Sequence, residues 1–426
     1  MNNKDFFQAL KTTNINYLLC DLHVHSIASA DVLDKVRYER LNAKEKALIE
    51  SLSITKDAYK EKWSEYDSLV ADKIRPEDYF NLIRERRDHI ADSYDLSEGK
   101  DWAVIAITDH NSCRFSCRLS KHAWNIKKEH RIIILPGMEL EVQFKVQDEY
   151  VKVHICLIFA PCVEDAQIYG AINSAYKNAT DTEESNWNFG DTIKVENIED
   201  FIKHLRGNPS FPAMCVAAHV GTSKGMCEET INVFTRKQVE YARLIAELEE
   251  YSAESNNKIS RKSYKKGEIE NKISALEGSL GDANLEALKL IGKCGFDALQ
   301  VSNIDDDTHY RCLHRFKPEY GRATTILCSD AHRLEDILNC GNNLVSYIKF
   351  PSFNSHITEG KFFELLNYSI RFGETRFTSV PENKLSCFIR GIELSPDTAD
   401  AKKFWPFNLT PPHRQDQILF CIWCGL

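Results

Sequence analysis

Six short apolar segments of this chain end at, or contain, side chains of the types that bind metal ions. Short apolar segments are typical of the buried strands of a parallel sheet or an α/β barrel. The accompanying metal-binding side chains are those of Asp21, His23, His25, Asp109, His110, Glu139, His154, His219, Asp330 and His332. Consecutive parallel strands bring the residues that follow them to the same edge. The sequence therefore predicts a barrel or sheet with a metal-binding C-terminal rim.

The size and charge of the chain limit what this rim can serve. At 426 residues, there is room for one large α/β domain of about 250–300 residues with appendages, or for two domains. A net charge of −9 argues against a broadly basic surface for nucleic acid. A local phosphate site is still compatible with that charge, because bound divalent cations would be the strongest charges there.

The chain shows no signal for export or for a membrane. Its first twenty residues lack the charged start and the long apolar core of a secretory signal. No segment approaches the ~18 consecutive apolar residues of a membrane span. Several of the 14 cysteines lie inside apolar segments, which is typical of reduced thiols. We therefore expect a cytoplasmic protein that does not contact a membrane.

The apolar segments and the regions between them suggest one barrel with two insertions. We expect the barrel over residues 15–350 and a C-terminal appendage over residues 351–426. Two long segments rich in helix formers interrupt the barrel, at about 32–95 and 236–290. A strand followed by a His-rich turn is expected over 15–31, and further strands are expected near 102–108, 131–136, 150–159, 214–219, 297–303 and 323–329.

The second insertion carries two apolar stripes at helical spacing. Their residues are Tyr241, Leu244, Leu248 and Tyr251, then Ile269, Ile273, Leu276 and Leu280. The polar stretch NNKISRKSYKKG between them could turn the chain, so an antiparallel helical hairpin is expected. We favour packing of these stripes against the body of the protein over an oligomerisation seam. A homo-oligomer thus stays open as the alternative.

The spacing of the metal-binding residues favours a shared site over six unrelated features. His23 and His25 follow each other at period two, as do Asp330 and His332, so each pair points to one side of an extended strand. Taken alone, each feature has an ordinary explanation, such as a capped turn or a hydrogen-bonded core histidine. The ordinary explanation must hold six times, always near a strand end, and the metal site explains all six at once.

In five short motifs the chain resembles the PHP (polymerase and histidinol phosphatase) family of phosphoesterases. The matching motifs are DLHVHS, ITDHN, PGMELEV, AAH and SDAH, between residues 21 and 332. The resemblance implies an α/β fold, a distorted (β/α)7 barrel with a trinuclear metal site at its C-terminal rim. Here that barrel would carry helical insertions and a short C-terminal appendage.

The resemblance also implies a ligand set for each ion. Carried over by motif, the first ion would be held by His23, His25, Glu139 and Asp330. Glu139 would bridge to a second ion held by His154 and His219. The third ion would take Asp31, His110 and His332. Asp109 is expected to orient a neighbouring ligand, since metal-bound histidines need hydrogen-bond partners of their own.

The ligand types indicate the chemistry. Imidazoles mixed with carboxylates suit two or three divalent ions such as Zn²⁺, Mn²⁺ or Fe²⁺. Ions about 3.5–4 Å apart can activate a water for attack on phosphorus, so no Ser or Cys nucleophile is needed. Three cations that follow barrel strands are candidates for neutralising the phosphate, although a surface charge is the commoner role for such residues: Arg311, Arg315 and Lys349.

A narrower resemblance concerns the region after the barrel. The stretches SDAHRLEDI, LVSYIKF and FFELLNYSIRFGETRF are similar to that region in large PHP proteins that continue into an SMC-like ATPase. Those proteins are associated with nucleic-acid processing and defence against phage. This chain has no G-x-x-x-x-G-K-[ST] phosphate loop. It would therefore act without the ATPase, pair with a separate ATPase, or be a truncated form.

These observations together predict a metal-dependent phosphoesterase. We expect it to hydrolyse phosphodiester bonds of nucleic acid or nucleotides, because of the large insertions near the rim and the ATPase-related resemblance. One alternative is a small-molecule phosphomonoesterase that resembles histidinol phosphatase. The other is a metal-binding regulatory subunit of a partner ATPase.

Overall fold

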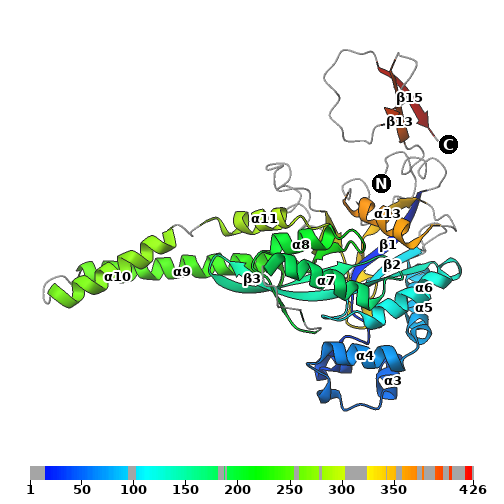
Figure 1. Ribbon diagram of the computed structural model, residues 1–426, viewed down its shortest axis with the longest axis horizontal. Coiled ribbons are helices and arrows are strands. Elements are labelled where there is room, and N and C mark those ends of the chain that lie inside the picture. The colour runs from blue at the N-terminus through cyan, green and yellow to red at the C-terminus, as the bar shows by residue number, and fades with distance from the viewer. Residues whose placement is uncertain are drawn as a thin grey trace.

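The computed structural model shows a mixed α/β protein built on one large curled sheet (Figure 1). It describes residues 15–94, 102–180, 187, 190–253, 259–277, 281–302, 324–341, 343–351, 357–371, 377–378, 389–396, 403–404 and 418–424. The 10-stranded sheet has the order β12-β11-β1-β2-β3-β4-β6-β7-β8, with β5 beside β3. Its strands are β1 Ile15–Val24, β2 Trp102–Ile107, β3 Ile132–Val146, β4 Glu149–Ile158, β5 Ile193–Lys194, β6 Met214–Ala217, β7 Ala298–Val301, β8 Thr325–Leu327, β11 Tyr347–Pro351 and β12 Phe377–Thr378. All seven expected strands are confirmed.

The central strands are parallel except for β4. The ladders β1–β2–β3 and β6–β7–β8 are parallel, and β4 runs antiparallel to both β3 and β6. The two sides of the sheet approach each other at β1, where Val24 forms a parallel bridge with Ala331 just after β8. A hydrogen bond from His25 N to Ala331 O, 2.8 Å long, continues this contact. The sheet thus curls in the manner of an α/β barrel.

Both faces of the sheet are covered, because side chains alternate between two apolar layers. Along β1, Leu18, Cys20 and Leu22 belong to one core, which also contains Val104 and Ala106 of β2. Leu19 belongs to the opposite core with Ile105 and Ile107. This period-two alternation of buried residues is typical of strands covered on both sides.

The first insertion is helical, as expected, and packs on the sheet. Its helices are α2 Lys35–Arg40, α3 Ala43–Ser51, α4 Trp63–Lys73 and α5 Pro76–Ser93. A capping box between Asn42 and Glu45 starts α3, and Pro76 occupies the first position of α5. Val70 of α4 and Phe80 of α5 are buried in the same core as the outer side of β1 and β2.

The second insertion forms an antiparallel hairpin of two long helices, α9 Met226–Ala253 and α10 Ile259–Glu277, followed by α11 Ala283–Cys294. Figure 1 shows this hairpin as an arm that extends to the left, away from the sheet. The hairpin itself is confirmed, but the expected packing of its apolar stripes against the body of the protein is not. Its apolar stripes pack against each other, with Leu244, Ile269 and Ile273 buried between the helices. The basic run 261–266 lies within α10 rather than in a turn.

The remaining elements cover the sheet or follow it. The helices are α6 Arg114–His130, α7 Asp165–Thr180, α8 Ile198–Arg206 and α13 Glu359–Arg371. Beyond them, β13 Ile389–Pro396, β14 Lys403–Phe404 and β15 Ile418–Cys424 form a small three-stranded sheet. Within the described ranges, no helix combines the length and the apolar character that a membrane crossing needs. Ten cysteines in these ranges are free thiols, as the sequence predicted.

Candidate metal centre

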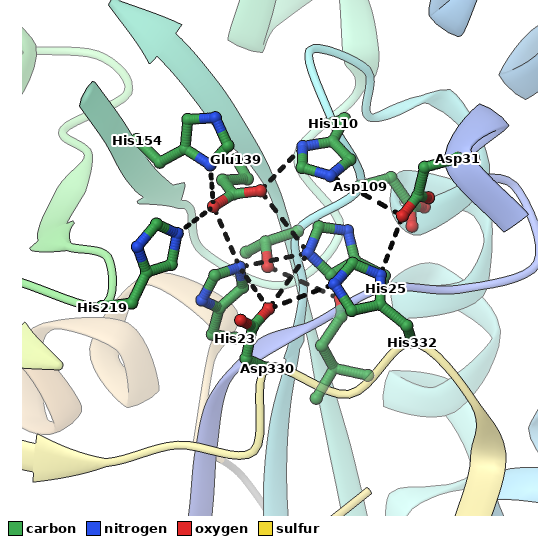
Figure 2. Close-up of polar contacts among 12 residues, drawn as sticks. His23, His25, Asp31, Asp109, His110, Glu139, His154, His219, Asp330 and His332 are labelled. Carbon is green, nitrogen blue, oxygen red and sulfur yellow. Dashed lines mark hydrogen bonds and ion pairs between the residues drawn. The ribbon is translucent and has the colours of Figure 1, made fainter. Parts of the chain in front are cut away.

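The nine predicted ligands lie together at one edge of the curled sheet, and Figure 2 shows their polar atoms facing one another. They come from β1, β3 and β4, from the turn after β1, and from the loops after β2, β6 and β8. The cluster comprises His23, His25, Asp31, His110, Glu139, His154, His219, Asp330 and His332. Residues far apart in the sequence therefore meet as the strand-end pattern predicted for eight of them and as the family resemblance implied for Asp31.

The carboxylate of Glu139 is at the centre of the cluster, and five imidazoles surround it. The distances from its Oε1 are 2.6 Å to His154 Nδ1, 3.2 Å to His219 Nε2 and 3.3 Å to His23 Nε2. Those from its Oε2 are 2.7 Å to His110 Nδ1 and 3.5 Å to His25 Nε2. Its two oxygens thus face two different groups of imidazoles. A carboxylate that bridges two cations needs this arrangement.

Two further carboxylates each gather other imidazoles of the same cluster. From Asp330 Oδ1 the distances are 3.4 Å to His23 Nε2, 3.5 Å to His25 Nε2 and 3.5 Å to His332 Nε2. From Asp31 Oδ2 they are 2.9 Å to His332 Nδ1 and 3.8 Å to His110 Nε2. The three residues predicted for the third ion therefore converge on one oxygen of Asp31.

The histidine pair after β1 is aimed by an irregularity in the ladder. The register between β1 and β2 shifts between Asp21 and Val24, and such irregularities redirect side chains. His23 and His25 end with their Nε2 atoms 3.2 Å apart, and both side chains are buried. The period-two spacing in the sequence thus places both imidazoles on the same side, as expected.

The loop after β2 continues alongside β3 and so brings His110 to Glu139. Asp109 O accepts from Glu139 N at 3.1 Å, and Glu139 O accepts from Asn111 N at 2.9 Å. The side chain of Asn111 then accepts from Glu141 N at 2.9 Å. These hydrogen bonds fix the backbone of His110 next to Glu139, and the His110 side chain takes no part in them.

Two ligands reach the rim from within strands, as expected for His154 but not for Glu139. Glu139 was expected where a strand stops, but β3 continues through it to Val146 and pairs with β4 as an antiparallel hairpin. His154 lies inside β4, opposite Glu141. Because β4 runs in the opposite direction, its N-terminal half reaches the edge where the parallel strands end. The hairpin thus brings both side chains to the rim from within strands.

Two ligands have a left-handed backbone. His219 follows β6 with a φ of 28°, and Asp330 follows β8 with a φ of 49°. Residues other than glycine rarely adopt this backbone conformation, and holding one in it costs of the order of 1–3 kcal/mol. Strain of this kind is concentrated at functional sites, where the surrounding contacts fix the geometry.

Two polar residues that the sequence reading missed hold the ligands in place. Gln300 of β7 accepts from His23 Nδ1 at 2.7 Å and from His219 N at 3.0 Å. Glu141 lies two residues after Glu139, on the same face of β3, and its Oε2 is 3.8 Å from His154 Nε2. Hydrogen bonding to His154 is the main cause that lowers the pKa of Glu141. A polar side chain inside an apolar strand was the available signal, since buried polar groups need partners.

Asp109 and Asp21 are buried carboxyls that shape the loops around the ligands. Asp109 accepts from Ser26 N at 2.6 Å and from Ser26 Oγ at 2.7 Å, so it anchors the turn after His25 rather than a ligand side chain. Asp21 accepts from Ser329 N at 2.9 Å and thereby ties the loop of Asp330 to β1. Burial raises the pKa of Asp109 to about 7 and that of Asp21 to about 6.

Electrostatics favour the metal-binding protonation state at two of the ligands, Glu139 and His25. At His23 and His154 burial opposes protonation, but neighbouring negative charges raise the pKa of both imidazoles. Burial raises the pKa of Glu139, but the charges of the neighbouring imidazoles, His110 first, hold it well below its usual range. Burial and then repulsion from His332 lower the pKa of His25 well below its usual value. At neutral pH, Glu139 is therefore ionised and His25 neutral. Metal ligands must be deprotonated in this way.

The residues at the rim could hold a metal ion. Ligand atoms within 4.8 Å of one another occur in four overlapping groups: His23, His25 and Glu139; His25, Asp31 and His110; His25, Asp330 and His332; and His110, Glu139 and His154. The buried Nδ1 atoms of His25 and His219 have no hydrogen-bond partner among the described residues. The fit to a cation comes instead from the ring nitrogens and carboxylates that face one another, because imidazole nitrogens and carboxylate oxygens are ligands of divalent transition metals.

Of the three cations expected to neutralise a phosphate, the structure describes only Lys349. Arg311 and Arg315 lie outside the described residues. The expectation that Lys349 lies at the rim is wrong. It pairs with Tyr17 in the β1–β11 ladder, and Tyr17 is six residues before His23, roughly 20 Å along β1 at about 3.3 Å per residue. The cation that does reach the cluster is Arg37 of α2, whose guanidinium contacts Asp31.

The first insertion also brings an indole to the rim. The ring of Trp63, the first residue of α4, lies with its centroid 5.1 Å from that of His110, at an interplanar angle of 56°. Trp63 is half-buried against the apolar core that contains Val70 and Phe80. Neither Arg37 nor Trp63 follows a strand, so the strand-end pattern could not identify them.

Comparison with models of known protein families gave no match, and no curated protein matched the chain. The function of the chain must therefore be inferred from the geometry of the cluster and from the sequence motifs that supply its ligands.

Proposed function

We propose that this protein is a metal-dependent phosphoesterase with a PHP-type (β/α)7 barrel and two or three divalent ions at its rim. The observation that carries the proposal is the carboxylate of Glu139 between two groups of imidazoles. Asp330 and Asp31 gather the remaining ligands on either side. Mixed imidazole and carboxylate sets suit Zn²⁺, Mn²⁺ and Fe²⁺.

The ligands divide into three overlapping sets in this proposal. They are His23, His25, Glu139 and Asp330; Glu139, His154 and His219; and Asp31, His110 and His332. Ions held there would supply an activated water and neutralise charge on the phosphoryl oxygens.

The protein's own contribution is to fix these ligands before substrate arrives. Gln300 accepts from Nδ1 of His23, which leaves Nε2 of that ring for the centre. Asp109 anchors the turn after His25 through Ser26. Such partners set ring orientation and ligand basicity. A site whose ligands are held in this way loses little free energy to reorganisation during the reaction.

Nucleotides or nucleic acid are the substrate class that we propose. Trp63 places an aromatic ring beside His110 at the rim, and aromatic rings bind bases by stacking, at about 1–3 kcal/mol per base. A phosphodiester next to the ions would have its base within reach of this ring. A small phosphomonoester without a base would not use it.

A matched pair of substitutions on β3 tests the proposal. Glu139→Gln keeps the size of the side chain but removes the charge shared by two groups of imidazoles, so activity should fall by roughly a thousandfold or more. Glu141→Gln on the same face of the strand should cost only about 10–100-fold, because Glu141 acts through His154. Bound metal is counted by elemental analysis of the same samples.

The substrates in this experiment are a dinucleotide, single-stranded DNA and RNA, and histidinol phosphate, each with Mn²⁺ or Zn²⁺. The proposal expects turnover of the diesters. Near-normal turnover by Glu139→Gln would refute the bridging role. Fast turnover of histidinol phosphate with the oligonucleotides untouched would make the protein a metabolic phosphatase. Metal binding without turnover of any of them would favour a regulatory subunit of a partner ATPase.

A further inference from the structure

Arg37 occupies a position among the predicted ligands of the third ion. It lies on α2, six residues after Asp31. Its guanidinium contacts Asp31 Oδ2, and its Nη1 is 3.1 Å from His332 Nδ1. Two of the three residues predicted for that ion therefore already have a cation of the protein as their neighbour.

The carboxylate oxygen that Arg37 contacts is also the point where the histidines converge. His332 Nδ1 and His110 Nε2 lie 2.9 and 3.8 Å from the same Asp31 Oδ2. A divalent ion bound between these three groups would sit against the guanidinium. Two cations in direct contact in a partly buried site repel each other strongly. The geometry therefore allows the ion or the guanidinium at this oxygen, but not both.

The first insertion holds Arg37 in this position. Asp34 caps α2 by accepting from Val36 N at 2.9 Å, and Lys60 Nζ lies 3.2 Å from Asp34 Oδ2. Asp31 itself is only 8% exposed, whereas the side chain of Arg37 is 39% exposed. The guanidinium thus contacts the cluster while part of the Arg37 side chain stays exposed to solvent.

We propose that Arg37 takes the place of the third ion, so that the centre holds two ions and one guanidinium. From there the outward N–H groups of Arg37 bind the phosphoryl oxygens of the substrate, the role first assigned to Arg311 and Arg315. A guanidinium suits this position because its planar fork of five donors can serve a carboxylate on one edge and a phosphate on another. The phosphate part of this proposal depends on the proposed function, whereas the ion count does not.

Counting bound metal tests the ion-replacing role directly. After loading with excess Mn²⁺ and removal of free ion, the wild-type protein should hold two ions per chain by elemental analysis. Arg37→Met removes the charge and keeps the length of the side chain, so it should hold three. The matched control is Arg40→Met, which changes an exposed arginine of the same helix and should hold two. Circular dichroism verifies the fold of each variant.

A second variant separates charge from shape and tests phosphate binding. Arg37→Lys keeps the charge, so it should still hold two ions. It should nevertheless bind inorganic phosphate about tenfold more weakly by calorimetry, because an ammonium lacks the bidentate fork. Three ions in the wild type, or two in a folded Arg37→Met, would overturn the replacement of the ion. Unchanged phosphate affinity in Arg37→Lys would overturn the contact with substrate.

The failures of the two proposals differ. If neither wild type nor variants bind Mn²⁺ or Zn²⁺, the metal centre itself is refuted, and the role of Arg37 falls with it. If the counts are two and three as expected but no phosphodiester or phosphomonoester is hydrolysed, the proposed activity is refuted. The position of Arg37 in the centre would then stand.

Discussion

The two helical insertions have a similar composition but pack on different partners. Both are long segments dense in helix formers with apolar residues at helical spacing. The apolar side chains of the first insertion, such as Val70 and Phe80, enter the core of the sheet. Those of the second, such as Leu244 and Ile273, form a small core between its own two helices. The pattern of a helix reveals that one face is buried, but not what buries it.

This difference in packing decides which insertion serves the rim. The first insertion supplies Arg37 and Trp63 to the cluster and, through Asp67, holds the helix that follows His110. The second starts near the rim but leads away from it. Its α9 has 28 residues, about 40 Å at 1.5 Å per residue. The basic run 261–266 near the far end of the hairpin therefore cannot line the rim.

The largest expected effect concerns Asp67, the link between the first insertion and the rim. Its carboxylate accepts from Arg114 N at 2.6 Å and from Phe115 N at 2.8 Å, so it caps the N-terminus of α6 from α4. Asp67→Ala leaves one buried and one partly buried donor without a partner, and it should lower the free energy of unfolding by about 2–4 kcal/mol. Metal should also bind more weakly, since α6 begins just after His110. Urea denaturation and metal titration measure both.

The effect of Asp67 on stability should depend on pH. Burial raises the pKa of Asp67 from 3.8 to about 7. The folded state thus holds the proton more tightly than the unfolded state, and this contribution is complete below pH 4 and lost as the pH rises through 7. The difference in unfolding free energy between wild type and Asp67→Ala should therefore shrink from pH 5 to pH 8. Asp72→Ala, an exposed aspartate of the same helix, is the control. A loss of stability equal to that of Asp72→Ala would mean that the link does not exist.

A smaller effect is expected for Trp63, the other contribution of the first insertion. Trp63→Ala should weaken binding of thymidine 5′-monophosphate by about tenfold, because stacking is worth about 1–3 kcal/mol per base. Binding of inorganic phosphate should not change, and Trp63→Phe should keep most of the affinity. Calorimetry with the two ligands measures this. Equal weakening for both ligands would mean that Trp63 supports His110 and does not bind a base.

The strands and eight of the nine ligands could be predicted because each depends on a local pattern, whereas Asp31 was implied only by the family resemblance. A short apolar segment marks a strand, and parallel strands bring their ends together. The extension of β3 was missed although its signal was present. Leu140, Val142 and Phe144 alternate with polar residues beyond Glu139 and are all buried. Period-two alternation of this length predicts a strand that continues.

The contributions of the first insertion could not be predicted, because they depend on tertiary packing. The segment contains several arginines, and nothing local separates Arg37 from Arg40, one helical turn further on. Only the docking of the helices on β1 and β2 decides which one meets Asp31. The same holds for Asp67, whose partners are backbone groups 47 and 48 residues away. Local patterns identify metal ligands more readily than the residues that surround them.

The smallest effect on activity is expected in the second insertion, and it sharpens the comparison most. Ile273 is buried between α9 and α10, so Ile273→Ala should destabilise the hairpin by about 2–4 kcal/mol. Hydrogen exchange should speed up in α9 and α10, with the sheet and α6 unchanged, because the arm has its own core. Metal content and turnover of a dinucleotide should stay at wild-type values. Val239→Ala, at a position of α9 that is 65% exposed, should change neither exchange nor turnover. Lower turnover in Ile273→Ala alone would show that the arm is coupled to the rim, and the contrast between the two insertions would then be wrong.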